Sequence, residues 1–189
     1  MSQQRTRTRP PRQQQRPPRQ ASDVIKLIVT GLSQSGKTRF IQSISQYTEW
    51  QDQPHTSWLF GRVRVDSKLI LHFLEPPTDN QFDFIWLRDV VSKVKATGFI
   101  VMLDSTRPQT FGEFLSIVYT IRGYHNNVPM VVAANKQDHP QAWAAQDIQL
   151  GLGIRDLSVM PCVAHDRELV RDVCVDLLYQ VISELPHPE

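Results

Sequence analysis

The stretch Gly31-Leu32-Ser33-Gln34-Ser35-Gly36-Lys37-Thr38 decides the fold of this chain. It follows the apolar run 24–30 and leads into 39–44, an order that predicts a strand, a glycine-bounded turn and a helix. The two glycines let successive backbone N–H groups point inward, and the helix N-terminus adds the positive end of its dipole. Residues 31–38, the phosphate loop, are therefore predicted to hold a triphosphate.

Two side chains of the phosphate loop have expected roles of their own. Lys37 is expected to reach the outer phosphates as a mobile positive charge, and the Thr38 hydroxyl is expected to be one ligand of a bridging Mg²⁺ ion. For the neighbouring Arg39, contact with the phosphates and a role in solubility both stay open. The residues predicted to bind nucleotide here are Gly31, Ser33, Gln34, Ser35, Gly36, Lys37, Thr38 and Arg39.

A second motif follows another apolar run. Residues 131–134 lead directly into Asn135-Lys136-Gln137-Asp138, the base loop. A carboxylate at a strand end can accept two parallel hydrogen bonds from the N1–H and exocyclic amine of guanine, a pattern that adenine does not offer. Asp138 is therefore predicted to select guanine. The stem of Lys136 could cover the base while its charge stays in water, and Asn135 could tie the base loop to the phosphate loop.

Apolar runs alternate with segments of helical periodicity along the rest of the chain. The predicted strands are 24–30, 58–65, 69–74, 98–103, 129–134 and 158–163, and the predicted helices are 37–47, 82–95, 111–124, 141–150 and 167–185. The polar segment 47–57 is predicted to be a surface loop, and 58–74 a hairpin. This pattern indicates an α/β fold of the P-loop type, with a mostly parallel six-stranded sheet, helices on both faces and ligand at the carboxyl ends of the strands.

Composition divides the 189 residues into two parts. Residues 1–22 are predicted to be a disordered tail rich in Arg, Pro and Gln, and 23–186 a single domain. The tail holds six arginines and no acidic residue, so a net charge of +2 leaves about −4 for the remainder. Two interpretations of the tail stay open: a weak electrostatic contact with an anionic membrane or nucleic acid, or a solubilising segment.

The sequence also bears on where the protein resides. It contains two cysteines, Cys162 and Cys174, without a pairing signature, and no apolar run approaches the ~20 residues that span a bilayer. We expect a cytoplasmic protein, with peripheral contact at the inner membrane surface as the consequence of an anchoring tail. The six histidines show no metal-ligand spacing.

The phosphate loop and base loop together resemble those of the Ras-like small GTPases. Residues 24–185 are most similar to the Arf branch and to the bacterial gliding-motility (Mgl-type) switch GTPases. This similarity rests on Gly31-Leu32, Leu103-Asp104-Ser105 and Gln137. The resemblance implies a GTPase domain that binds GTP or GDP with Mg²⁺. It also implies effector and regulatory partners, which would bind the switch loops and the hairpin 58–74.

The resemblance implies further site residues. The backbone N–H groups of Cys162, Val163 and Ala164 would face the guanine carbonyl, although a plain strand end is the alternative. Thr56 would be the first-switch threonine that closes on Mg²⁺ and the terminal phosphate, with Thr48 and Ser57 as neighbouring alternatives. The catalytic set implied in this way is Lys37, Thr56 and Asp79.

The chain departs from the family after the strand 69–74. Family members have Asp-x-x-Gly followed by a catalytic Gln, whereas this chain has Glu75-Pro76-Pro77-Thr78-Asp79. Glu75 can still hold a Mg²⁺ water, but the two prolines have no N–H to donate to a phosphate. Asp79, in the place of the water-positioning amide, would face a terminal phosphate that is already negative.

Three functions follow from these motifs. The first is a GTP/GDP switch whose segments 48–60 and 75–85 change with the terminal phosphate and which hydrolyses GTP slowly. The alternative is a GTP-bound scaffold that does not turn over and serves as a protein-interaction module. A P-loop kinase or ATPase is a distant third, which Asp138 argues against.

Overall fold

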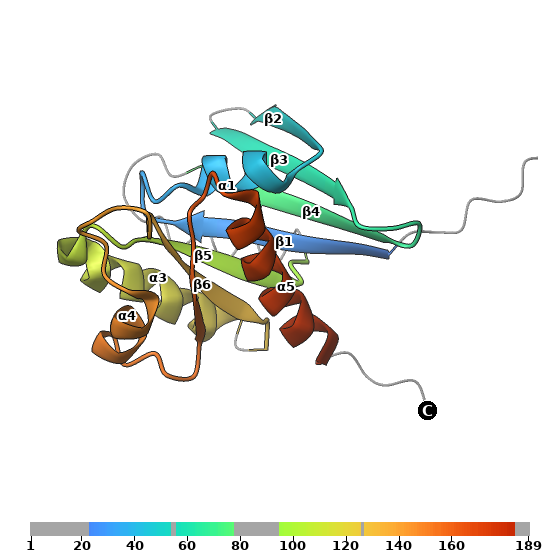
Figure 1. Ribbon diagram of the computed structural model, residues 1–189. Helices are drawn as coiled ribbons and strands as arrows, with labels where there is room; N and C mark the ends of the chain where they lie inside the picture. Colours follow the sequence, from blue (N-terminus) through green and yellow to red (C-terminus); the bar gives the residue numbers. More distant parts are fainter. Residues whose placement is uncertain (1–22, 54–55, 78–94, 126, 184–189) are drawn as a thin grey trace, which may run out of the picture.

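The computed structural model describes residues 23–53, 56–77, 95–125 and 127–183. Its centre is a seven-stranded sheet in the order β2-β3-β4-β1-β5-β6-β7 (Figure 1). The strands are β1 (Asp23–Gly31), β2 (Tyr47–Gln53), β3 (Thr56–Arg64), β4 (Leu69–Glu75), β5 (Gly98–Asp104), β6 (Met130–Asn135) and β7 (Ser158–Pro161). Strands β4, β1, β5, β6 and β7 are parallel, while β3 runs antiparallel to both β4 and β2. The predicted α/β fold with a mostly parallel sheet is confirmed.

Helices cover both faces of the parallel part of the sheet. They are α1 (Lys37–Ile44), α3 (Phe111–Tyr124), α4 (Ala145–Gly151) and α5 (Arg167–Ser183), with a short 3-10 helix η1 (Pro108–Thr110) before α3. Alternate residues of β1 separate the two layers, because Leu27 and Val29 pack with α1 and α5 whereas Ile28 packs with α3 and α4. Strands buried on both faces are expected to be continuously apolar, as residues 98–103 of β5 are.

The sheet has one more strand than the sequence predicted. Residues 47–53 were predicted to lie in a loop, but they form the edge strand β2, which pairs with β3 from Tyr47↔Arg62 to Gln53↔Thr56. Its side chains are largely exposed, so no apolar alternation marks it. The prediction failed because an edge strand depends on backbone pairing with its neighbour, although Tyr, Thr and Trp do favour strands.

The element boundaries otherwise agree with the prediction to within a few residues. The largest differences are α4, which begins at Ala145 where a helix from 141 was predicted, and α1, which ends at Ile44 where 47 was predicted. The predicted tail 1–22, the predicted helix 82–95 and Asp79 lie wholly or almost wholly outside the described residues. None of the described helices is long and apolar enough to cross a membrane.

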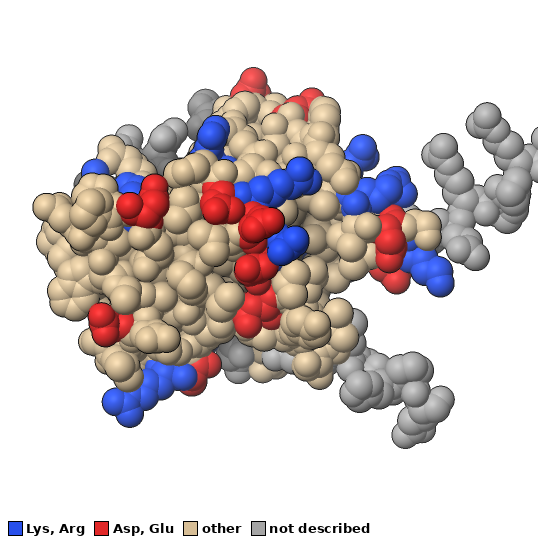
Figure 2. Space-filling model, in the orientation of Figure 1, with Lys and Arg blue, Asp and Glu red and all other residues tan. Residues whose placement is uncertain are grey.

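The last helix shows how the outer surface is built. One stripe of α5, which includes Val173 and Leu177, packs into the core, while Glu168, Asp172 and Asp176 lie on its outer side. Acidic side chains accordingly gather along α5 in Figure 2. This face is solvated, whereas the carboxyl ends of β1, β4, β5, β6 and β7 point their connecting loops toward one edge of the sheet, where ligands bind in folds of this kind.

Candidate functional site

The phosphate loop requires glycine at both ends. Gly31 has φ +137°, and a Cβ there would lie 2.3 Å from the Met102 carbonyl oxygen of β5. Gly36 has φ +104°, and a Cβ there would lie 2.2 Å from Nδ2 of Asn135. Both Cβ distances are far shorter than an ordinary van der Waals contact. A side chain at Gly36 would therefore displace Asn135. The two glycines therefore let the loop lie directly against the ends of β5 and β6.

Lys37 is held inside the phosphate loop. Its Nζ donates to the carbonyl oxygen of Leu32 at 2.8 Å, and the side chain is buried. Burial lowers the pKa of Lys37 from its ordinary value, and the nearby Glu75 carboxylate opposes that shift. A buried ammonium with one neutral hydrogen-bond acceptor is poorly compensated, which favours the approach of an anion.

Thr38 and Glu75 meet across the start of α1 and the end of β4. The Thr38 hydroxyl donates to Glu75 Oε1 at 3.0 Å. The second oxygen, Oε2, is buried without a hydrogen-bond partner among the described residues. Burial raises the pKa of Glu75, against the hydrogen bond from Thr38 and the charge of Lys37. An orphaned buried carboxylate oxygen beside a hydroxyl suits a hydrated divalent cation.

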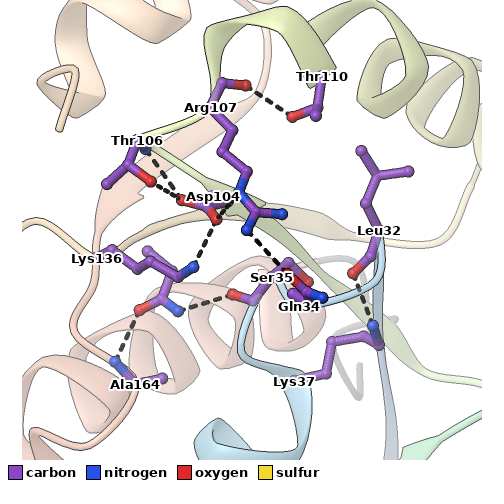
Figure 3. A network of polar contacts seen from close by, with 11 residues as sticks. Leu32, Gln34, Ser35, Lys37, Asp104, Thr106, Arg107, Thr110, Lys136 and Ala164 are labelled. Carbon is purple, nitrogen blue, oxygen red and sulfur yellow. Dashed lines mark hydrogen bonds and ion pairs between the residues drawn. The ribbon is translucent and has the colours of Figure 1, made fainter. Parts of the chain in front are cut away.

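Asn135 connects three loops from a buried position. Its Nδ2 donates to the carbonyl oxygen of Ser35 at 2.7 Å, and its Oδ1 accepts from the N–H of Ala164 at 2.8 Å. The predicted tie between the base loop and the phosphate loop is therefore confirmed. Figure 3 shows Ser35, Ala164 and the surrounding polar contacts at close range.

Lys136 has a partner that the sequence interpretation missed. Its Nζ lies 2.6 Å from Oδ2 of Asp104, so the ammonium is ion-paired, while the Lys136 side chain remains 34% exposed. Burial alone would raise the pKa of Asp104, but hydrogen bonds from Lys136 and Thr106 hold it below its ordinary value. Asp104 ends β5 and is in register with Asn135 at the end of β6, and this adjacency of two strand ends is the signal that could have revealed it.

Ser105 and Gln137 form a further support that the sequence interpretation did not assign. The Gln137 amide donates to the Ser105 hydroxyl and to the Trp143 carbonyl, both at 2.8 Å. The N–H of Trp143 donates to the Ser105 carbonyl at 2.9 Å. These contacts hold the base loop against the end of β5.

Asp138 lies at the exposed rim of the base loop, and no hydrogen bond to it is found within the described part of the chain. Of the three residues expected to face the guanine carbonyl, Cys162 and Ala164 already donate their N–H groups to Ala134 and Asn135. The expected donor set therefore narrows to the N–H of Val163.

The remaining predicted site residues are Ser33, Arg39, Thr56 and Asp79. Ser33 and Arg39 are exposed. Thr56 is the first residue of β3, three residues before Leu59, which pairs with Glu75. Its role at the cation stays a prediction. Asp79 lies outside the described residues. Within the described ranges, no cluster of three or more His, Cys, Asp or Glu side chains is suited to a metal.

A protein-family model matches most of the chain. Residues 16–181 match the model of a family described as "Arf: ADP-ribosylation factor family". No curated protein matches the chain. The matched range includes the phosphate loop, the base loop and every described strand and helix up to residue 181 of α5.

Proposed function

The chain belongs to the ADP-ribosylation factor family, a branch of the Ras-like GTP-binding small GTPases, and from this premise we propose that it binds GTP and GDP with magnesium and hydrolyses GTP slowly. The proposal rests on the two hydrogen bonds of the Asn135 side chain. One joins the base loop to the phosphate loop through Ser35, and the other joins the base loop to the loop after β7 through Ala164. These two hydrogen bonds link the segments proposed to bind phosphate and base.

The proposed roles divide between the two loops. The phosphate loop and the α1 N-terminus would hold the phosphates through backbone N–H groups, and Lys37 would leave the Leu32 carbonyl for the outer phosphates. Asp138 would accept the guanine edge, and the stem of Lys136, with its ammonium drawn toward Asp104, would lie along the base.

For magnesium, the proposed holders are Thr38 and Glu75. The orphaned Oε2 of Glu75 supports this assignment, since an oxygen of this kind can accept from a metal-bound water. When bound, the ion neutralises charge that develops on the phosphates. Thr56 is proposed as a further holder, from its place in the family pattern.

Slow hydrolysis is proposed from the residues after Glu75. Pro76, which is buried, and Pro77 have no N–H to offer the terminal phosphate. Asp79 replaces the family's water-positioning amide with a carboxylate, which repels the terminal phosphate. The same two features favour the second candidate, a GTP-bound scaffold without turnover.

Partners and location complete the proposal. Effectors and regulators would bind the switch segments and the β3–β4 hairpin, and the exposed Trp50 of β2, the strand that pairs with β3, offers an apolar contact. We propose a cytoplasmic protein whose basic tail contributes a weak contact with anionic membrane or nucleic acid.

Identification of the nucleotide that co-purifies with the protein tests the proposal. The protein would be denatured and the released nucleotide separated by chromatography. A mixture of GDP and GTP supports the slow switch, whereas GTP without GDP supports the scaffold. Release of ATP or ADP in place of guanine nucleotide would contradict both.

A further inference from the structure

A second connection joins the phosphate loop to the base loop, and Arg107 lies at its centre. The Arg107 Nη2 donates to Gln34 Oε1 at 2.9 Å, and its Nε lies 3.4 Å from Asp104 Oδ2. The same carboxylate oxygen holds Lys136 Nζ at 2.6 Å. Figure 3 shows these four side chains, the outer bridge, running from one loop to the other.

The two ends of the outer bridge have unusual backbones. Gln34 has φ +63° and Lys136 has φ +68°. Among the described residues, only three that are not glycine have positive φ, and two of them are these ends. A residue other than glycine keeps this left-handed backbone conformation only where its surroundings hold it there. The outer bridge bonds to the side chains of both residues, so it is placed to keep both loops in their present conformation.

Arg107 is itself firmly anchored at its backbone. Its N–H donates to the Asp104 carbonyl at 3.2 Å, and its carbonyl accepts from the N–H and the hydroxyl of Thr110 at 3.0 and 2.8 Å. The guanidinium therefore extends from a fixed point. Its planar fork contacts Asp104 and Gln34 through different nitrogens, which the single ammonium of a lysine reproduces poorly.

The outer bridge differs from the Asn135 tie in its exposure. Asn135 is 3% exposed, whereas the Arg107 side chain is 43% exposed. Water can therefore compete for the Arg107 contacts, and the bridge can open without disturbing the core. It is the more accessible of the two connections between the loops.

We propose that Arg107 is a positioning residue that keeps the phosphate and base loops closed and thereby slows the release of bound nucleotide. The inference rests on the proposed function, because it concerns the same nucleotide. Arg107 should therefore affect the dissociation rate of the nucleotide and have little effect on its association rate. A partly exposed bridge between the loops resists their opening but does not attract ligand from a distance.

The test is the dissociation rate of a fluorescent GDP analogue, chased with excess GDP in stopped flow. Arg107→Ala should raise the rate about threefold to tenfold, the effect of losing about 1 kcal/mol from a charge-assisted bond at a partly exposed position. Gln34→Ala should raise it similarly, and the double variant should be no faster than the faster single variant. Arg107→Lys should resemble Arg107→Ala, and the association rate should change by less than about twofold.

Arg171→Ala is the matched control, because Arg171 forms an exposed pair with Asp172 on α5 away from the loops. It should leave dissociation unchanged. An unchanged dissociation rate in Arg107→Ala would overturn the inference, and so would single-variant effects that multiply in the double variant. In either case, GDP binding by the wild type would leave the proposed function standing. Equal loss of thermal stability with and without GDP would also overturn the inference, by showing a merely structural role. Failure of the wild type to bind GDP would overturn both.

Discussion

Replacement of Asn135 by alanine is expected to weaken nucleotide binding strongly. The side chain is buried and makes one hydrogen bond to the Ser35 carbonyl and one to the Ala164 N–H. Truncation leaves two backbone groups without these partners. Each such group costs about 1–3 kcal/mol, and partial access of water to the space left behind brings the sum to about 2–4 kcal/mol.

That loss should appear both in stability and in affinity, because the bonds hold the loops in the arrangement that binds. We expect the Kd for GDP to rise at least about thirtyfold, the equivalent of ~2 kcal/mol. Calorimetric titration measures it, alongside urea unfolding of the nucleotide-free protein. Asn135→Asp is a matched variant of equal size that keeps the acceptor for Ala164 but sets an oxygen against the Ser35 carbonyl, so it should bind as poorly.

Gln149→Ala provides the control for stability alone. The Gln149 amide donates to the Leu157 carbonyl at 2.6 Å, outside the loops of the site. Its loss should reduce stability without changing GDP affinity. If Asn135→Ala lost stability to the same degree and kept its GDP affinity, the tie would serve the fold alone and our reasoning would be refuted.

Three further predictions concern the cation, the chemistry and the tail. Because burial raises the pKa of Glu75 above its ordinary 4.5, its contribution to the stability of the nucleotide-free protein is full below that value and is lost as pH rises through the raised pKa. Glu75→Gln should therefore raise Tm at neutral pH and reduce the effect of Mg²⁺ on nucleotide affinity. An unchanged Mg²⁺ dependence would exclude Glu75 as a holder. Single-turnover phosphate release should be at or below about 10⁻⁴ per second and should rise in Asp79→Gln, whereas an unaided wild-type rate of about 0.1 per second would disprove our interpretation of residues 75–79. If the tail is an anchor, anionic vesicles should retain the protein at low salt and release it at high salt, and deletion of residues 2–20 should abolish retention; retention by the truncated protein would count against it.

The sequence predicted most of the fold because the central strands and helices carry strong local signals. The apolar runs of β1, β5 and β6 and the periodicity of α3 and α5 each require one buried arrangement. Strand β2 was missed because its exposed side chains, Trp50 among them, show no buried face. Its existence depends on pairing with β3, which local pattern does not contain.

The site divides in the same way. Asn135 was predicted to tie the loops because its motif stands at a strand end, and the structure has the bond. The contacts of Asp104 with Lys136 and Arg107 were missed. Lys136 lies 32 positions from Asp104 in the sequence. Arg107 lies only 3 positions away, but around a turn whose shape is set by tertiary packing. The bond from Arg107 to Gln34 spans 73 positions and has no sequence signature.

Guanine selection by Asp138 is the most direct test of the central claim, which is that these two loops form a guanine-nucleotide site. Calorimetric titration of the nucleotide-free protein with GTP, GDP and ATP measures it, with Asp138→Ala beside the wild type. Loss of one member of a charged hydrogen-bonded pair costs about 2–5 kcal/mol, so Asp138→Ala should weaken GTP and GDP together by at least about thirtyfold. The wild type should prefer GTP strongly to ATP, and equal affinity for the two would contradict the account.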